Sequence, residues 1–159
     1  MRVLIVSDTH GRHFSFDDAL EQAGKIDYLV HLGDVEGEEW YYESMAGCPA
    51  YVIAGNNDYY SRNLREMEIM FGNKRAFMTH GHQYRISYGP ELLLREAIRR
   101  KADIVMHGHT HKPYVKEING ITFLNPGSLT LPRQEGHKSS YIIMEIDRRN
   151  QVKYEICYL

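Results

Sequence analysis

Cysteine is scarce in this chain. Cys48 and Cys157 are its only two thiols, and they lack the short spacing of a metal-binding cysteine pair. That scarcity excludes a thiolate metal site. We expect both residues to be reduced, small apolar side chains of a cytoplasmic protein, with a single disulfide between them as the alternative.

Long apolar runs and a basic excess are also missing. No run approaches the roughly 20 residues that a transmembrane helix needs, and the apolar part of "MRVLIVSDTHG" is too short for a signal peptide. The 19 Lys and Arg against 21 Asp and Glu give a net charge of -2, without the excess of a dedicated nucleic-acid-binding protein. We therefore expect neither a membrane nor a nucleic-acid polymer as partner.

What the chain does contain is an ordinary globular composition. Its 159 residues, 43% hydrophobic and 25% charged, suit one domain over 1–159 with a sizeable core. No linker, repeat or low-complexity stretch interrupts it. The nine histidines are the unusual feature, because several of them are clustered.

The first half alternates buried strands with helices. Near-continuous apolar runs predict strands at 2–7, 28–32 and 50–54, and amphipathic stretches predict helices at 15–24 and 38–47, each ended by a glycine. Ser15 and Asp18 have the spacing of a capping box at the start of the first helix. This rhythm indicates βαβ units and a parallel sheet.

The second half follows another pattern. It predicts a hairpin of strands 65–71 and 75–80 around Gly72-Asn73, a helix at 90–101 with Pro90 in its first turn, and a strand at 103–109. The C-terminal third predicts antiparallel strands within 114–125, 139–147 and 152–159, with turns at Asn119-Gly120 and 148–151. The expected fold is α/β with a parallel and an antiparallel part.

Polar clusters follow the predicted strand ends. They are "SDTHG", "LGDVEG", "AGNND", "THGH" and "HGHTH", and their leading residues, Asp8, Asp34, Asn56, His80 and His109, recur every 22 to 29 residues. That interval is about one βα or hairpin unit, so the clusters are expected along one edge of the sheet, where open α/β sheets bind ligands.

The donors in these clusters are carboxylate, amide and imidazole groups. Asp8 and His10 are two residues apart, as are His109 and His111, so on extended backbone each pair points to one side. Oxygen and nitrogen ligands without thiolate suit Mn²⁺, Fe, Co²⁺, Ni²⁺ or Zn²⁺.

The series "DTH", "GD", "GNND", "HGH", "GHTH", in this order, resembles the calcineurin-like metallophosphoesterases, in particular their short prokaryotic phosphodiesterase branch. "NPGS" at 125–128 and the chain length match as well. The resemblance spans Asp8 to Ser128. It implies a four-layer α/β/β/α sandwich of two mixed β-sheets flanked by helices.

The resemblance also implies a site. Asp8, His10 and His111 would hold one divalent metal, Asn56, His80 and His109 a second, and Asp34 would bridge them. Two such ions, with Mn favoured, would activate a bridging hydroxide for attack on the phosphorus of a small phosphodiester. Because the histidines must be unprotonated to bind metal, activity is expected to be lost below about pH 6.

"GNND" departs from the family pattern at one position. Asn57 stands where most members carry a histidine that protonates the leaving group, and an amide cannot deliver a proton at neutral pH. Asp58 is then expected to hold the loop beside the site. The hypothesis is that good leaving groups are preferred, or that water or His82 serves as the acid.

Other interpretations remain at this point. Taken singly, Asp8, Asp34 and Asn56 could be helix caps, and the histidines could be core or loop residues. Tyr59 and Tyr60 could stack on a nucleoside or pack in a loop. Asn125 and Ser128 would shape the loop beside the metals. The competing functions are a protein-binding scaffold with this fold, a nuclease and a phosphomonoesterase, and a homo-oligomer is compatible with all of them.

Overall fold

The computed structural model describes residues 1–159. The helices are α1 (Phe14–Ala23), α2 (Glu39–Met45) and α3 (Glu91–Arg99), with a 3₁₀ turn η1 at His82–Tyr84. The strands are β1 (Arg2–Val6), β2 (Tyr28–His31), β3 (Ala50–Val52), β4 (Glu66–Phe71), β5 (Lys74–Thr79), β6 (Ile104–Met106), β7 (Tyr114–Ile118), β8 (Ile121–Asn125), β9 (Ser140–Ile146) and β10 (Val152–Tyr158). None of the helices is both long and apolar enough to span a bilayer.

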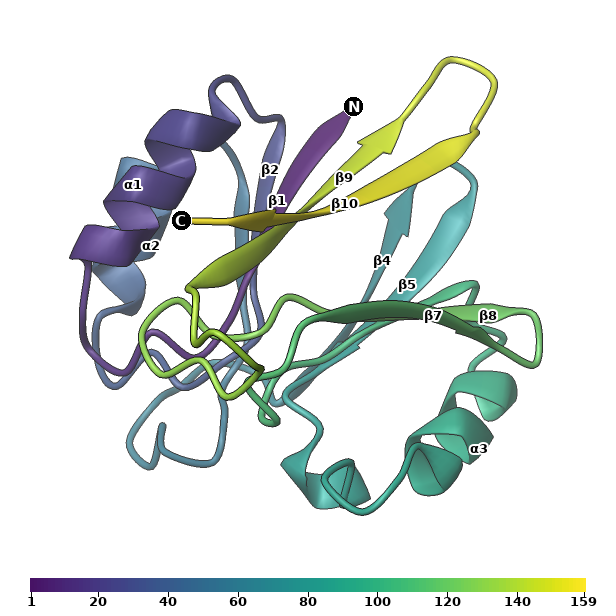
Figure 1. The fold of residues 1–159 in the computed structure, drawn as a ribbon. Helices are drawn as coiled ribbons and strands as arrows, with labels where there is room; N and C mark the ends of the chain where they lie inside the picture. The colour runs from purple at the N-terminus through teal and green to yellow at the C-terminus, as the bar shows by residue number, and fades with distance from the viewer.

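Two five-stranded mixed sheets form the centre of the molecule (Figure 1). One has the strand order β10-β9-β1-β2-β3, with β1, β2 and β3 parallel. The other has the order β4-β5-β6-β8-β7, with β5, β6 and β8 parallel. Helices α1 and α2 cover the outer face of the first sheet and α3 that of the second. The expected four-layer α/β/β/α sandwich is confirmed.

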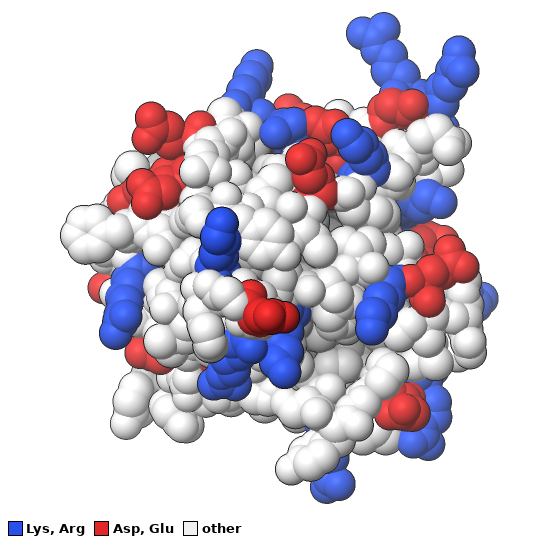
Figure 2. Space-filling view, in the orientation of Figure 1, with Lys and Arg blue, Asp and Glu red and all other residues white.

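The layers are held by three apolar cores. Alternate residues of β1 show why its sequence is apolar throughout: Val3 and Ile5 face the core between the sheets, whereas Leu4 and Val6 face the core under α1 and α2. A third core lies under α3 and includes Leu93 and Phe77. Charges of both signs are interspersed on the face in Figure 2, as a net charge of -2 leads one to expect.

Most predicted elements are present with shorter bounds. The hairpin at Gly72-Asn73 joins β4 to β5, and the turn at Asn119-Gly120 joins β7 to β8. The predicted strand 103–109 is regular only over Ile104–Met106. The predicted capping box is wrong: α1 begins after His13 without any side-chain cap, so Ser15 already lies inside the helix. Pro90 is the N-cap of α3 rather than a residue of its first turn.

The polar clusters gather from both sheets rather than along one edge of a single sheet. Asp8, Asp34 and Asn56 follow parallel strands β1, β2 and β3 of the first sheet, while His80 and His109 follow β5 and β6 of the second. Stacking the two sheets therefore brings two rows of strand ends together and surrounds a site from two sides.

Candidate metal centre

The loops that carry the site have an unusual backbone. Asp8, His10, Asp34, His109 and His111 all have φ angles between 47° and 68°, in the left-handed region. The expectation that extended backbone aligns Asp8 with His10, and His109 with His111, is therefore wrong, because β1 and β6 end before these residues. Left-handed turns orient the side chains instead, a local strain that proteins concentrate at functional sites.

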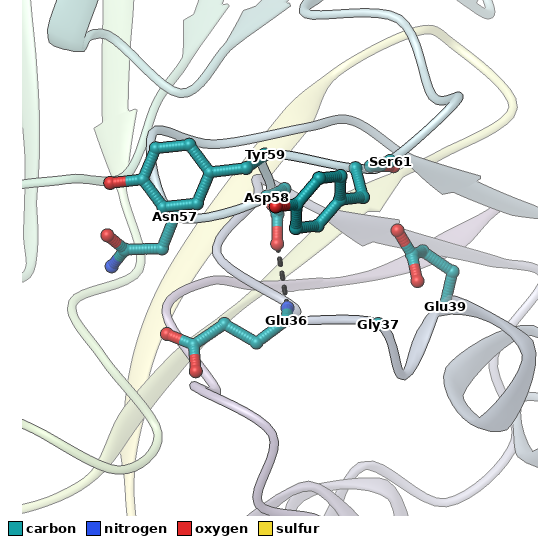
Figure 3. Close-up of a pocket in the computed structure, with 8 residues that line it drawn as sticks. Glu36, Gly37, Glu39, Asn57, Asp58, Tyr59 and Ser61 are labelled. Atoms are coloured by element: carbon teal, nitrogen blue, oxygen red, sulfur yellow. Dashed lines mark hydrogen bonds between the residues drawn. The ribbon is translucent and has the colours of Figure 1, made fainter.

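Asp58 holds two of these loops together. Its Oδ2 accepts hydrogen bonds from the amides of Asp34 and Gly55, each at 2.7 Å. Its Oδ1 accepts one from the amide of Glu36, also at 2.7 Å (Figure 3). The carboxylate is buried and uses both oxygens on backbone donors. Asp58 therefore fixes the loops after β2 and β3 relative to each other, and its contacts are with backbone amides.

Asp8 is a buried carboxylate with one committed and one free oxygen. Oδ2 accepts from the Ser7 hydroxyl at 2.6 Å and from the His109 amide at 3.1 Å. Oδ1 is buried without a hydrogen-bond partner. Gly108 permits this approach, because a Cβ there would lie 2.0 Å from Ser7 Oγ. The pKa of Asp8 lies at about 2, because His111 and His80 together outweigh the burial that would raise it.

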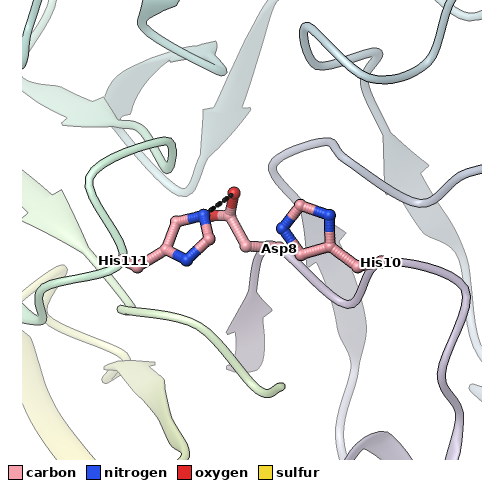
Figure 4. A group of neighbouring side chains, drawn as sticks. All are labelled: Asp8, His10 and His111. Carbon is pink, nitrogen blue, oxygen red and sulfur yellow. Dashed lines mark ion pairs between the residues drawn. The ribbon is translucent and has the colours of Figure 1, made fainter. Parts of the chain in front are cut away.

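The unprotonated nitrogen of the neutral His111 ring faces Asp8 Oδ1. Its Nδ1–H donates to the Leu131 carbonyl at 2.7 Å, and a carbonyl can only accept, so the neutral ring carries its lone pair on Nε2. Nε2 lies 3.0 Å from Asp8 Oδ1 (Figure 4). Two electron pairs face each other there unless a proton or a metal ion lies between them.

His10 completes this group from the other side. Its Nδ1 donates to Glu36 Oε1 at 2.8 Å, which leaves Nε2 buried and without a partner. Ligand atoms of Asp8, His10 and His111 all lie within 4.8 Å of one another. A carboxylate behind a histidine is the usual support of a metal ligand, because it fixes the tautomer and strengthens the lone pair.

A second group lies beside the first and shares Asp8. It consists of Asp8, Asp34 and His80, again within 4.8 Å of one another. His80 Nδ1–H donates to the Leu32 carbonyl at 2.7 Å, while Nε2 faces Asn56 Oδ1 at 3.1 Å and Asp34 Oδ2 at 3.5 Å. Both nitrogens of this buried ring thus face oxygen acceptors, an arrangement that a cation bound beside Nε2 would relieve.

The remaining predicted residues surround these groups. Asn57 donates from its backbone N–H to Asp34 Oδ1 and from its side-chain Nδ2 to Asp34 Oδ2, both at 2.9 Å. His109 is half-buried, with its ring 5.3 Å from that of His80, and burial lowers its pKa. His82 lies in η1 with its ring 5.5 Å from His80, and burial lowers its pKa to about 4. The carboxylate common to both groups is that of Asp8, so the bridging role of Asp34 stays a prediction.

Sequence reasoning missed Glu36, the carboxylate that supports His10. The available signal was its position in "LGDVEG", two residues after Asp34. It missed Thr130 as well, whose hydroxyl donates to the Asp8 carbonyl at 3.0 Å. Ser128, expected to shape this loop, donates to the same carbonyl at 2.7 Å. The segment after β8 thereby ties Asp8 to the carbonyl that orients His111.

His31 is a buried histidine of the loop framework. It accepts from the Gly33 amide through Nδ1 at 3.3 Å, and Nε2 lies 3.0 Å from Thr9 Oγ1, so the ring is neutral and donates to Thr9. Burial lowers its pKa from 6.5 to about 3. Between these values the unfolded chain binds a proton that the folded chain does not, so stability is present above pH 6.5 and falls as the pH falls.

We expect this one group to cost the metal-free protein about 1.4 kcal/mol of unfolding free energy per pH unit below pH 6. The measurement is urea unfolding at pH 7.0, 6.0 and 5.0 for wild type and His31→Asn, whose amide oxygen can still accept from Gly33. The plot of unfolding free energy against pH should be shallower for the variant, by the slope that corresponds to one bound proton. Parallel slopes would show that His31 is already protonated in the folded chain.

Comparison with known proteins matches residues 1–149 to the calcineurin-like phosphoesterase superfamily domain. The chain is 28% identical to the probable metallophosphoesterase MG207 of Mycoplasma genitalium, over 99% of this chain and 95% of that protein. It is 30% identical to phosphodiesterase YfcE of Escherichia coli K12, over 92% and 89%. Among solved structures, Vps29 of Entamoeba histolytica in complex with Zn²⁺ is 28% identical, with a TM-score of 0.79 and 99% coverage of both chains.

Proposed function

The chain belongs to the calcineurin-like phosphoesterase superfamily, and on that premise we propose that it is a dimetal phosphodiesterase acting on small substrates. The family supports a phosphoester hydrolase that depends on divalent metal. Cys48 and Cys157 form no disulfide with each other, which agrees with the cytoplasmic location that we propose for this activity.

One observation carries the proposal. At the meeting point of the two sheets, Asp8 Oδ1, His10 Nε2 and His111 Nε2 converge with their electron pairs uncommitted, while backbone or carboxylate acceptors hold the outward nitrogens. Desolvated acceptors facing one another are costly unless a cation sits among them. The residues present therefore fit divalent metal, and nitrogen and oxygen donors suit a first-row ion.

Each residue then has a proposed role. Asp8, His10 and His111 would hold one ion, and Asn56, His80 and His109 would hold the other, with Asp34 as the ligand that both would share. Two ions in such a site supply an activated water and neutralise the phosphoryl oxygens. Glu36, Leu131 and Leu32 fix the histidine tautomers that make this binding possible.

Asn57 supports a preference for diesters with good leaving groups. One N–H of its side-chain Nδ2 donates to Asp34 Oδ2, which leaves the second N–H of that group to donate to a phosphoryl oxygen without transferring a proton. The proton for the leaving group then comes from water or from His82. A diester suits this site better than a monoester, whose second negative charge meets the carboxylates of Asp8 and Asp34.

The second candidate is a protein-binding scaffold with this fold. Two observations favour it: the similarity to Vps29, and the large exposed side chains Phe14 and Trp40 on α1 and α2, which are 85% and 64% exposed. The uncommitted ligand atoms at the metal centre favour the enzyme.

Elemental analysis followed by a metal-titrated assay separates the two. We expect about two divalent ions per chain, loss of bis(p-nitrophenyl) phosphate hydrolysis after chelation, and its return on titration with Mn²⁺, Fe²⁺, Co²⁺, Ni²⁺ or Zn²⁺. The value of kcat/KM should exceed that on p-nitrophenyl phosphate by about tenfold or more, a difference of roughly 1.4 kcal/mol in transition-state binding. Bound metal without turnover of either ester would favour the scaffold.

A further inference from the structure

Two hollows open beside the metal centre, and they differ in charge. The first, about 460 Å³, is lined by Glu36, Gly37, Glu39, Asn57, Asp58, Tyr59, Tyr60 and Ser61. The second, about 360 Å³, is lined by Ser87, Thr110, Lys112, Tyr114 and Arg133. The first contains carboxylates and no cation, whereas the second contains two cations and no carboxylate. We call them the acidic hollow and the basic hollow.

Both hollows are built onto the residues that organise the metal ligands. In the acidic hollow, Glu36 holds His10 and Asn57 holds Asp34. In the basic hollow, Thr110 lies between His109 and His111 in the chain, and the Arg133 amide donates to the His111 carbonyl at 3.0 Å. A molecule bound at the metals therefore has one hollow on the side of Asn57 and the other on the side of Thr110.

The cations of the basic hollow have no partner within the protein. Neither Lys112 nor Arg133 takes part in an ion pair, whereas several arginines elsewhere on the chain do, as Arg2 does with Glu145 and Arg100 with Glu66. Glu135 shares the loop of Arg133 but does not line the hollow. The positive charge is thus available to a ligand and is focused by the concave surface.

The hydroxyl groups of the basic hollow add a donor. Asn125 Nδ2 donates to Thr110 Oγ1 at 2.9 Å, so the Thr110 oxygen is used as an acceptor and its O–H remains to donate. The Tyr114 hydroxyl is already bonded to His107. Thr110 and Ser87 therefore complement the two cations with neutral donors, the combination that anions bind in proteins.

A phosphodiester has two ester arms, and the two hollows distinguish them by charge. An arm with a second anionic group is repelled by Glu36 and Glu39 and attracted by Lys112 and Arg133. We propose that the basic hollow binds a second anionic group of the substrate, such as a phosphate, and that the substrate class is a diester with one anionic arm. This inference rests on the proposed function. Lys112 and Arg133 would be its specificity-determining residues.

A third hollow adjoins the basic hollow and has an apolar wall against which part of the anionic arm can pack. It measures about 210 Å³, shares Thr110 and Tyr114 with the basic hollow, and is lined otherwise by Ile86, Pro90, Lys116 and Ile118. Lys116 Nζ lies 5.6 Å from the centre of the Tyr114 ring, which adds a third cation beside the apolar wall. The apolar portion of an arm could pack there while its anion reaches Lys112 and Arg133.

The test compares two nucleotides that differ by one phosphate. Calorimetry with added Mn²⁺ gives the Kd of thymidine 3′,5′-bisphosphate and of thymidine 5′-monophosphate for wild type, for Lys112→Gln/Arg133→Gln, and for a control double variant. The control, Arg148→Gln/Lys153→Gln, removes the same charge from the exposed β9–β10 hairpin, on the opposite side of the fold from the loops of the site (Figure 1). Hydrolysis of the two corresponding 5′-p-nitrophenyl diesters is measured in parallel.

We expect wild type and control to bind the bisphosphate more tightly by about tenfold or more, as charge-assisted bonds to one added phosphate should provide. In Lys112→Gln/Arg133→Gln the ratio should fall to near one, with binding of the monophosphate unchanged. Equal binding of the two nucleotides by wild type, or a ratio untouched by the variant, would overturn the inference. If wild type preferred the bisphosphate but hydrolysed neither diester, the proposed function would be refuted. The basic hollow would still be supported as an anion-binding site.

Discussion

Asp8→Asn is expected to lower kcat/KM on a chromogenic diester by about a thousandfold or more, because it removes the proposed metal ligand that belongs to both groups of the site. The replaced atom can be identified. Oδ2 accepts from Ser7 and from the His109 amide, so the asparagine oxygen must take that position. The new NH₂ then replaces Oδ1 and faces His111 Nε2, at 3.0 Å in the wild-type chain.

This geometry predicts a separation of activity from stability. In the metal-free variant, the NH₂ can donate to the lone pair of His111, so this contact no longer needs a proton held between two acceptors. The metal-free Asp8→Asn protein should be as stable as metal-free wild type or more so, yet it should gain no thermal stability when Mn²⁺ is added. Wild type should gain about 2.7 kcal/mol at a hundredfold excess of metal over Kd.

The measurements are thermal unfolding with and without metal, and initial rates at saturating Mn²⁺. Asp18→Asn is the matched control, because Asp18 is an exposed carboxylate on α1 without a hydrogen bond to the site. If the Asp8→Asn variant had wild-type rates, Asp8 could not be a metal ligand that the reaction requires. A variant that fails to fold without metal would show that Asp8 Oδ1 is not an uncompensated acceptor.

Asp58→Asn is expected to be the most destabilising substitution of an acid in this chain. The carboxylate accepts from the amides of Asp34, Gly55 and Glu36, and it uses both oxygens to do so. An asparagine offers only one acceptor, so its NH₂ must face a backbone N–H at the other position. The loss of charge-assisted bonds and the unpaired donor together cost about 2–4 kcal/mol, which corresponds to roughly 5–15 °C in Tm for a chain of this size.

Activity should fall in the same variant, because the loops after β2 and β3, which present Asp34 and Asn56, lose their common anchor. Asp103→Asn is the control: Asp103 is exposed and accepts a single backbone hydrogen bond, from the Arg75 amide at 2.7 Å. It should shift Tm by only a few degrees. Equal effects of the two substitutions would mean that Asp58 is no more than one surface acceptor among others.

The chemistry of the site was predictable from the sequence because it depends on residue type and order. Continuous apolar runs indicated the buried strands, and polar clusters followed those strands at regular intervals. Any one of the motifs is weak evidence, but the whole series in order is specific. Asn57 was also identifiable as a departure, since it occupies a definite place in "GNND". The α/β architecture, the order of the elements and the family all came from this information.

Other features depended on which atoms meet after the sheets stack. The left-handed backbone at Asp8 and His111 replaced the extended pairing expected from their spacing, because turn geometry past a strand end is set by packing on the neighbouring loop. Glu36 became the support of His10 only once β1 and β2 lay side by side. The difference between the two hollows arises in the same way, since Arg133 reaches the His111 loop from a distant segment. The fold class and the family could be predicted from the residues alone, because they follow from local patterns and their order, and the same patterns supplied the candidate donor set. The identity of the free nitrogen of each histidine, and the position of the charges beside the candidate metal centre, became clear only from the folded chain. A tautomer and a local electrostatic field are set by neighbours that are distant in the sequence.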